Sequence, residues 1–145
     1  MSELLRKNRD EGASVVEFAV VLPLLLLLVF GIMEAGWAFA QQVEVRNAAR
    51  EGARLAVVDF PVPGSGNSAA IAAEVCARAS LSADRAVVSI RDTGNGSARV
   101  LVSQDYESLT GLLPVFNNLT IRSAVEMRIE RDEVTWLDIV DEACT

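Results

Sequence analysis

The stretch that decides the fold is residues 12–39, which read GASVVEFAVVLPLLLLLVFGIMEAGWAF. Its central part, from Phe18 to Met33, contains sixteen residues without a charge. Together with the apolar residues before Glu17, this segment approaches the roughly 20 residues that a helix needs to cross the hydrocarbon core of a bilayer. The sequence therefore predicts a membrane-spanning helix.

Glu17 is out of place in a plain membrane anchor, because an acidic side chain inside such a helix costs about 2.5–3.5 kcal/mol on insertion scales. A polar leader, MSELLRKNRDE, precedes Gly12 and has no apolar stretch of its own. A secretory signal peptide is cut after its hydrophobic segment, whereas the small residues Gly12, Ala13 and Ser14 lie before this one. A cut after Gly12 would remove the leader and leave the whole helix on the mature chain.

This arrangement of Gly12, then Glu17 and Phe18, then a long apolar helix resembles the prepilin processing site of type IV pilin-like proteins. The resemblance implies cleavage between Gly12 and Ala13 by a membrane prepilin peptidase, which makes Glu17 the fifth mature residue. It also implies that the Glu17 carboxylate meets the new amino terminus of a neighbouring subunit, since paired charge is tolerated where isolated charge is not. Pro23 matches a proline common in such helices and predicts a kink, because it removes one backbone hydrogen bond.

The segment after the span narrows the resemblance. Its core, Asn47-Ala48-Ala49-Arg50-Glu51-Gly52-Ala53-Arg54, resembles the signature of TadE-like proteins of the tight-adherence (Flp) pilus system. A later loop with Leu-Leu-Pro and a strand ending in Met-Arg-Ile-Glu are similar to that family too, so the resemblance runs from Gly12 to about Glu130. It implies a pseudopilin or minor pilin whose partners are the prepilin peptidase, other minor pilins, the major Flp pilin and the inner-membrane assembly platform.

The charges that flank the span predict its orientation. Arg6, Lys7 and Arg9 precede it, whereas Glu34 and Glu44 follow it before the first arginine. By the positive-inside rule the leader is cytoplasmic. We therefore expect a single-pass protein of the bacterial inner membrane with its C-terminal domain in the periplasm.

The sequence pattern of a helix continues beyond the span to about residue 58. Small side chains recur on one face, which predicts a close approach of this helix to other helices, as in membrane and pilus bundles, or simply reflects the helix propensity of alanine; they are Ala48, Ala49, Gly52, Ala53 and Ala56. Arg46, Arg50 and Arg54 recur every four residues. We interpret them as a solvated stripe, with a docking stripe for an acidic partner as the alternative.

The remainder of the chain has an α+β pattern. A loop at 59–68, with two prolines and two glycines, ends the long helix. A short helix is predicted at 69–79, and alternating residues predict strands at 86–91, 98–103 and 119–129. The predicted fold class is therefore α+β, with a long N-terminal transmembrane helix running into a small domain in which one short helix packs on an antiparallel sheet of about three strands.

The acidic tail at 130–145 contains apolar residues at a spacing that predicts a short amphipathic helix. Cys76 and Cys144 predict one disulfide in an exported domain, with two free thiols as the alternative. The apolar loop at 106–118 is interpreted as packing on its own domain, although contact with a membrane or a partner is also open. The predicted organisation is a leader at 1–12, a transmembrane and stalk helix at 13–58, and a periplasmic domain at 59–145.

Composition argues against several classes of function. The chain has no histidine, no cluster of cysteines and no Gly-rich phosphate loop, so we expect no cofactor, no metal site and no enzymatic activity. Twenty acidic residues against thirteen basic ones, with a single lysine, speak against nucleic acid binding. The predicted function is that of a minor pilin in assembly or initiation of a Tad pilus for surface adherence. The alternatives are a membrane scaffold of the Tad apparatus that keeps its leader, and an adhesin that uses the loop at 112–116.

Overall fold

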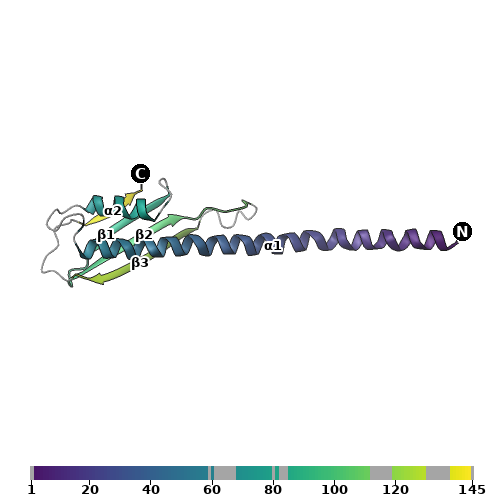
Figure 1. Cartoon of the computed structure of the whole chain (residues 1–145), viewed down its shortest axis with the longest axis horizontal. Coiled ribbons are helices and arrows are strands. Elements are labelled where there is room, and N and C mark those ends of the chain that lie inside the picture. Colours follow the sequence, from purple (N-terminus) through teal and green to yellow (C-terminus); the bar gives the residue numbers. More distant parts are fainter. Residues whose placement is uncertain are drawn as a thin grey trace.

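The computed structural model describes residues 2–58, 60, 68–79, 81, 85–111, 119–129 and 138–144, and for residues 2–11 and 140 it describes the backbone alone. Two helices and four strands lie within these ranges. They are α1 (Ser2–Val57), α2 (Ser68–Arg78), β1 (Ala86–Asp92), β2 (Ser97–Asp105), β3 (Thr120–Arg128) and β4 (Ile139–Ala143). Figure 1 shows α1 as a long rod whose C-terminal half lies on the sheet, while its N-terminal half projects away from it.

The four strands form one antiparallel sheet in the order β3-β2-β1-β4. β1 and β2 form the predicted hairpin, and Gly94 and Gly96 in its turn have φ of 72° and 70°, a region that favours glycine. The predicted α+β class is confirmed, and the three predicted strands differ from the observed ones by at most two residues at either end.

β4 corrects one prediction. Residues 139–143 of the tail form a strand on the outer edge of β1, not part of an amphipathic helix. Ile139 lies opposite Ile90, so this segment satisfies the open hydrogen-bonding edge of β1 and adds an apolar side chain next to the core. Those contacts are long-range, and helical spacing within the tail could not reveal them. The part of the predicted tail helix at 130–137 lies outside the described residues.

Both helices cover the same face of the sheet. α1 packs over β2 and β3, while α2 lies beside α1 and packs over β1 and β4. The largest fully buried side chains come from both helices and the two central strands: Val45, Ile71, Val75, Val88, Ile90, Val100 and Val102. The alternation predicted for β2 is confirmed, because Val100 and Val102 are buried while Arg99 is exposed. The core therefore includes the stalk half of α1.

The small side chains of α1 are what allow this close packing. Ala48, Ala49 and Ala53 are at most 1% exposed. A Cβ atom added to Gly52 would lie 2.9 Å from Val100 Cγ1 and 3.0 Å from Val75 Cγ2. Gly52 thus marks the point where α1, α2 and β2 meet. Of the two interpretations of the small-residue face, close packing is the one that the structure supports.

The N-terminal half of α1 contacts none of the described domain. Within Gly12–Val57 the helix is long and apolar enough to cross a membrane, and none of its most apolar window is buried. No residue between Gly12 and Met33 is buried. The helix continues through Pro23 without interruption, so the kink predicted at that residue stays a prediction.

Replacing Gly52 with leucine tests the packing. We expect Gly52→Leu to lower the free energy of unfolding by about 1–3 kcal/mol, because the added atoms must displace two core valines. The matched control is Gly36→Leu, since a Cβ at Gly36 meets nothing within 4 Å. Calorimetry of the detergent-solubilised chain should show a melting temperature lower by roughly 5–15 °C for Gly52→Leu and little change for the control. Equal melting temperatures for the two variants would contradict this packing.

Candidate functional site at the membrane boundary and along the stalk

The residues of the predicted processing site all lie on the free part of α1. Gly12, Ala13, Glu17 and Phe18 are exposed, and Phe18 is 63% exposed. A Cβ at Gly12 would meet nothing within 4 Å. No described residue forms an ion pair with Glu17. The structure therefore leaves this end of the helix open to molecules outside the chain.

At the other end of the apolar stretch, Glu34 is buried against the segment 106–111, which we call the strap. Its side chain is only 3% exposed. Glu34 Oε1 accepts hydrogen bonds from the Tyr106 hydroxyl at 2.5 Å and from Leu109 N at 3.1 Å. Glu34 Oε2 accepts from Thr110 Oγ1 at 2.9 Å and Thr110 N at 3.2 Å. One carboxylate therefore gathers four donors from a segment more than seventy residues away.

Two further residues on the same side of α1 hold the strap. Trp37 Nε1 and Gln41 Nε2 both donate to the Glu107 carbonyl oxygen, at 2.9 and 2.8 Å. Gln41 Oε1 accepts from Glu107 N at 3.1 Å, so this glutamine satisfies both backbone groups of Glu107. Residues 34, 37 and 41 follow the three-to-four-residue spacing of one helix face. The strap is therefore fixed to α1 over about two helical turns.

Sequence reasoning missed this arrangement. It used Glu34 only as an acidic residue that follows the span and assigned no partner within the chain to Trp37 or Gln41. The available signal was an acidic residue followed at helical spacing by a tryptophan and a glutamine, all of which need partners if one side of the helix is covered. The identity of the partner could not be read from the chain.

Tyr106 has an unusual environment for a phenol. Its side chain is buried, and its hydroxyl donates to the Glu34 carboxylate. Burial, followed by this hydrogen bond and by the negative charge of Glu34, raises the pKa of Tyr106 to about 12. The phenol therefore stays neutral and keeps its donor hydrogen across the physiological range.

A groove of about 390 Å³ lies beside the strap, between α1 and the edge strand β3. Gly31, Ala35 and Ala38 line its helix side, while Leu119 and Ile121 line its strand side. Its walls are mainly apolar side chains, and it begins at the end of the predicted membrane span.

The stretch at 47–54 separates into two sets of residues. Ala48, Ala49, Gly52 and Ala53 are buried in the core, whereas Asn47 and Arg50 are exposed. Arg46 and Arg54 are exposed too, as the interpretation of a solvated stripe requires.

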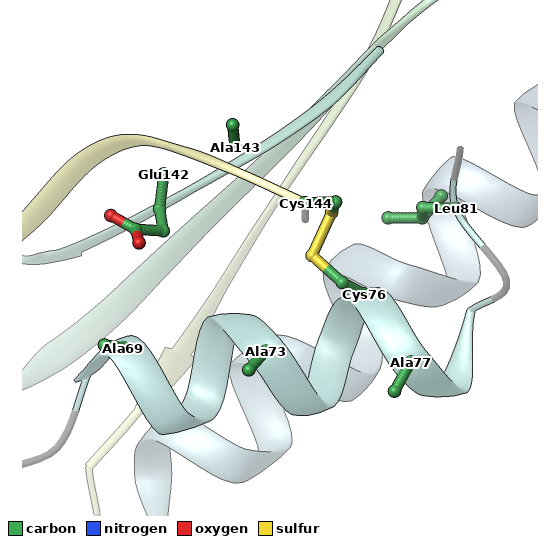
Figure 2. A pocket seen from close by; sticks show the side chains of 8 residues that line it. All are labelled: Ala69, Ala73, Cys76, Ala77, Leu81, Glu142, Ala143 and Cys144. Carbon is green, nitrogen blue, oxygen red and sulfur yellow. A yellow bond between two sulfur atoms is a disulfide. The ribbon is translucent and has the colours of Figure 1, made fainter. Parts of the chain in front are cut away.

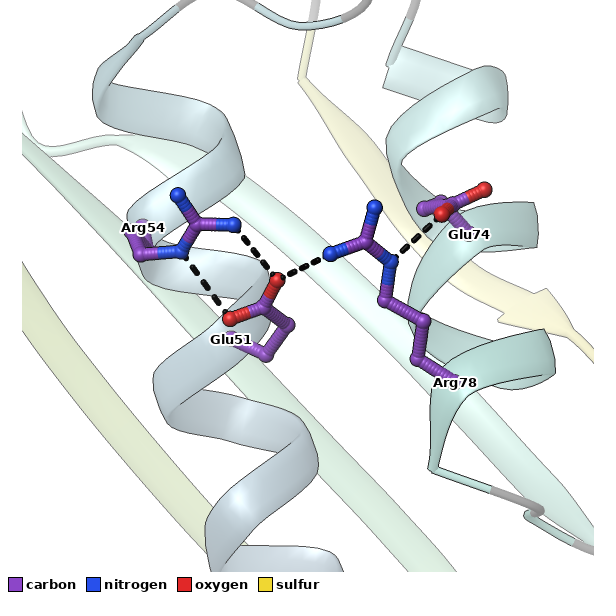
Figure 3. A network of polar contacts seen from close by, with 4 residues as sticks. All are labelled: Glu51, Arg54, Glu74 and Arg78. Atoms are coloured by element: carbon purple, nitrogen blue, oxygen red, sulfur yellow. Dashed lines mark hydrogen bonds and ion pairs between the residues drawn. The ribbon is translucent and has the colours of Figure 1, made fainter.

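Glu51 links the two helices through ion pairs (Figure 3). Its carboxylate accepts from Arg54 Nη2 at 2.7 Å and Arg78 Nη1 at 2.8 Å. Arg78 Nε also donates to Glu74 Oε1 at 2.5 Å, and the hydrogen bond to Glu74 is the main cause that raises the pKa of Arg78. Because these side chains are substantially exposed, the pairs contribute little to stability, so the network orients α1 and α2 more than it stabilises them.

Cys76 and Cys144 form a disulfide that joins α2 to the residue after β4, with their Cα atoms 5.6 Å apart. No cysteine of the chain is free. Within the described ranges, no group of three His, Cys, Asp or Glu side chains is placed to hold a metal ion.

Comparison with known proteins gives one match. Residues 12–54 match the family model for TadE-like proteins, which covers the apolar part of α1 and the stalk up to Arg54. Neither the curated proteins nor the solved structures contain a match. The matched residues include both the predicted processing site and the face that packs on the sheet.

Titration of Tyr106, the only tyrosine in the chain, tests the strap contact. We expect its tyrosinate absorbance to rise with a midpoint of about 12, against about 10 for a solvated tyrosine. Because the pKa is higher in the folded chain, the stabilisation by the neutral phenol is complete below about pH 10 and is lost as the pH rises toward about 12.

Glu34→Gln should lower this midpoint but keep it above about 10, since burial is the larger cause of the shift. Glu44→Gln is the matched control, because Glu44 is an exposed glutamate on the same helix. A wild-type midpoint near 10 would mean that Tyr106 is not packed against Glu34.

Proposed function

Because residues 12–54 match the family model for TadE-like proteins, we propose that this chain is a pseudopilin or minor pilin of a Tad (Flp) pilus, cut by a prepilin peptidase between Gly12 and Ala13. In this role it takes part in the assembly or initiation of the pilus, which mediates surface adherence. The observation that carries the proposal is the apolar arm of α1, which bears Gly12 and Glu17 and in which no residue from Gly12 to Met33 is buried by the described part of the chain.

Glu17 supports assembly with other subunits. It lies in an apolar, exposed part of α1, and no ion pair with a described residue offsets the cost of placing its charge in a membrane. Cleavage after Gly12 would create an ammonium group at Ala13, four residues before Glu17. Such a group on a neighbouring subunit can pair with the Glu17 carboxylate inside a helix bundle. This provides a reason for subunits to move together from the lipid into a filament.

The uncovered side of the stalk fits the same role. Phe39 is 69% exposed and Val43 is 53% exposed, although both lie beyond the predicted span. They are one helical turn apart on α1, and Arg50 follows two turns after Val43. An apolar stripe that continues past the membrane suits packing against the helices of other minor pilins or the major Flp pilin. The described residues of the domain bury another side of α1, where Val45, Ala48 and Ala49 lie.

The partners and location follow from this arrangement. The prepilin peptidase acts at the cytoplasmic end of α1, and the inner-membrane assembly platform receives the mature subunit. The domain lies in the periplasm, as the basic leader predicts and as a disulfide between Cys76 and Cys144 favours.

The second candidate is a single-pass scaffold of the Tad apparatus that never enters a filament. The observation in its favour is that α1 is continuous from Ser2 to Val57, so the leader extends the membrane helix without a break. A scaffold would retain residues 1–12, whereas a filament subunit would lose them.

The intact mass of membrane-extracted protein from cells with and without the prepilin peptidase separates these two functions. We expect a chain that begins at Ala13 only where the peptidase is present. Gly12→Leu should remain uncut in both strains, while Gly36→Leu, a glycine of the same helix outside the processing site, should be cut as the wild type is. A full-length chain in both strains would favour the scaffold.

The role of Glu17 has its own test. We expect Glu17→Ala to leave cleavage largely intact and to reduce the amount of the chain in sheared pili, because the mature subunit loses the partner for a neighbouring amino terminus. Glu44→Ala removes an exposed glutamate beyond the span and should have little effect. Quantitative immunoblots of the pilus and membrane fractions make the measurement, and undiminished incorporation of Glu17→Ala would count against the pairing.

A further inference from the structure

The disulfide joins α2 to the residue that follows the short strand β4. β4 has only five residues, and Asp141, Glu142 and Ala143 in it are exposed. Its register against β1 shifts between Val88 and Ile90, and Asp141 there has a φ of 57°. Ser89 Oγ donates to Asp141 Oδ1 at 3.3 Å and accepts from Asp141 N at 3.1 Å. Cys144, only 3% exposed, is the one deeply buried side chain that follows this strand.

Most of the described core lies outside β4. Its largest fully buried side chains belong to α1, α2, β1 and β2, and Ile139 of β4 packs at its margin. In particular, Ile71 and Val75 anchor α2 in the core, five residues and one residue before Cys76. We therefore expect α2 to be folded, with Cys76 in its final place, before β4 is attached.

Cys76 lies where another protein can reach it. It is half-buried, whereas Cys144 is buried. A hollow of about 310 Å³ beside the disulfide is lined along α2 by Ala69, Ala73 and Ala77. Figure 2 shows these three short side chains along α2 beside Cys76, so the part of this helix that lines the hollow next to the sulfur carries only alanines.

We propose that Cys76 is the residue through which an extracytoplasmic thiol–disulfide oxidoreductase oxidises this domain, and that Cys144 is the resolving cysteine. The hollow along α2 is the surface on which that enzyme approaches. This inference goes beyond the pilin function and rests only on the proposed orientation, in which the domain leaves the cytoplasm.

The chemistry is a two-step exchange. The Cys76 thiol loses its proton, and its thiolate attacks the disulfide of the oxidoreductase. A mixed disulfide forms, and one thiolate of the enzyme leaves. The Cys144 thiolate then attacks Cys76 Sγ, which forms the Cys76–Cys144 bond and expels the second enzyme thiolate. Two electrons pass from the two cysteines to the enzyme, and the two protons released by the cysteines balance the two thiols that the enzyme gains.

The closing step has a structural consequence. Until β4 is attached, β1 presents an unpaired edge between Ala86 and Asp92, and such edges recruit strands from other chains. Oxidation covers that edge with the chain's own residues and leaves β3 as the other edge of the sheet. The exchange thus covers the free edge of β1 before the domain assembles with other subunits.

The test uses the full chain in two strains of a Gram-negative host, one with and one without its periplasmic disulfide oxidase. Free thiols are blocked with N-ethylmaleimide in acid-quenched cells, and the intact mass counts the adducts. We expect no adduct where the oxidase is present and two where it is absent. Equal oxidation in both strains would overturn the assignment of an enzyme partner.

The single cysteine variants test the order of attack. Cys144→Ser should accumulate a mixed disulfide between Cys76 and the oxidase, at least about tenfold more than Cys76→Ser accumulates at Cys144. The double variant Cys76→Ser/Cys144→Ser is the control for non-specific capture. Equal or reversed trapping overturns the order. Limited proteolysis of Cys144→Ser should still yield a resistant domain, and its complete digestion would show that the core needs β4 first.

The result is independent of the proposed pilin role. Loss of residues 1–12 appears in the same spectra as a separate mass difference. A chain that is oxidised by the enzyme but keeps its leader would support this inference and contradict the filament function.

Discussion

The structure depends on the close contact of Gly52 with Val100 and Val75, since a single Cβ at this position would lie within about 3 Å of both valines. That contact brings α1 onto β2 and α2 at once, and the alanines at 48, 49 and 53 extend it along the helix. Because protein interiors are close-packed, this contact fixes the position of α1 relative to α2 and β2. The stalk half of α1 is therefore a core element of the domain.

The strap provides the second attachment, about five turns of helix nearer the predicted membrane. Between Glu34 and Gly52 the helix spans roughly 27 Å, and it is held at both ends. Because Glu34 directly follows the apolar run and is bound by the strap, the domain has a defined orientation relative to the membrane-spanning part. A subunit built in this way moves as one piece when neighbours draw its helix from the lipid, which suits the proposed pilin function and would equally serve a scaffold.

The sequence predicted those features that follow from local pattern. The apolar span, the α2 helix, the β1–β2 hairpin and the alternation in β3 all repeat at the period of their own element, so they could be derived without the fold. The predicted tail helix was wrong for residues 139–143, because the strand there is selected by the free edge of β1. The partners of Glu34, Trp37 and Gln41 were missed for the same reason: they come from a strap about seventy residues away. The resemblance to TadE-like proteins drew attention to the stretch at 47–54. Only the structure shows which of its residues are buried in the core and which are exposed.

Hydrogen–deuterium exchange of the full chain in lipid nanodiscs tests the central claim most directly. If α1 and the sheet form one body, peptides covering 34–57 of α1 should exchange as slowly as those covering 98–104 of β2, and mild denaturant should release both together. Protection of 34–57 that is lost well before that of β2 would mean that the stalk moves independently of the domain, and would contradict the account.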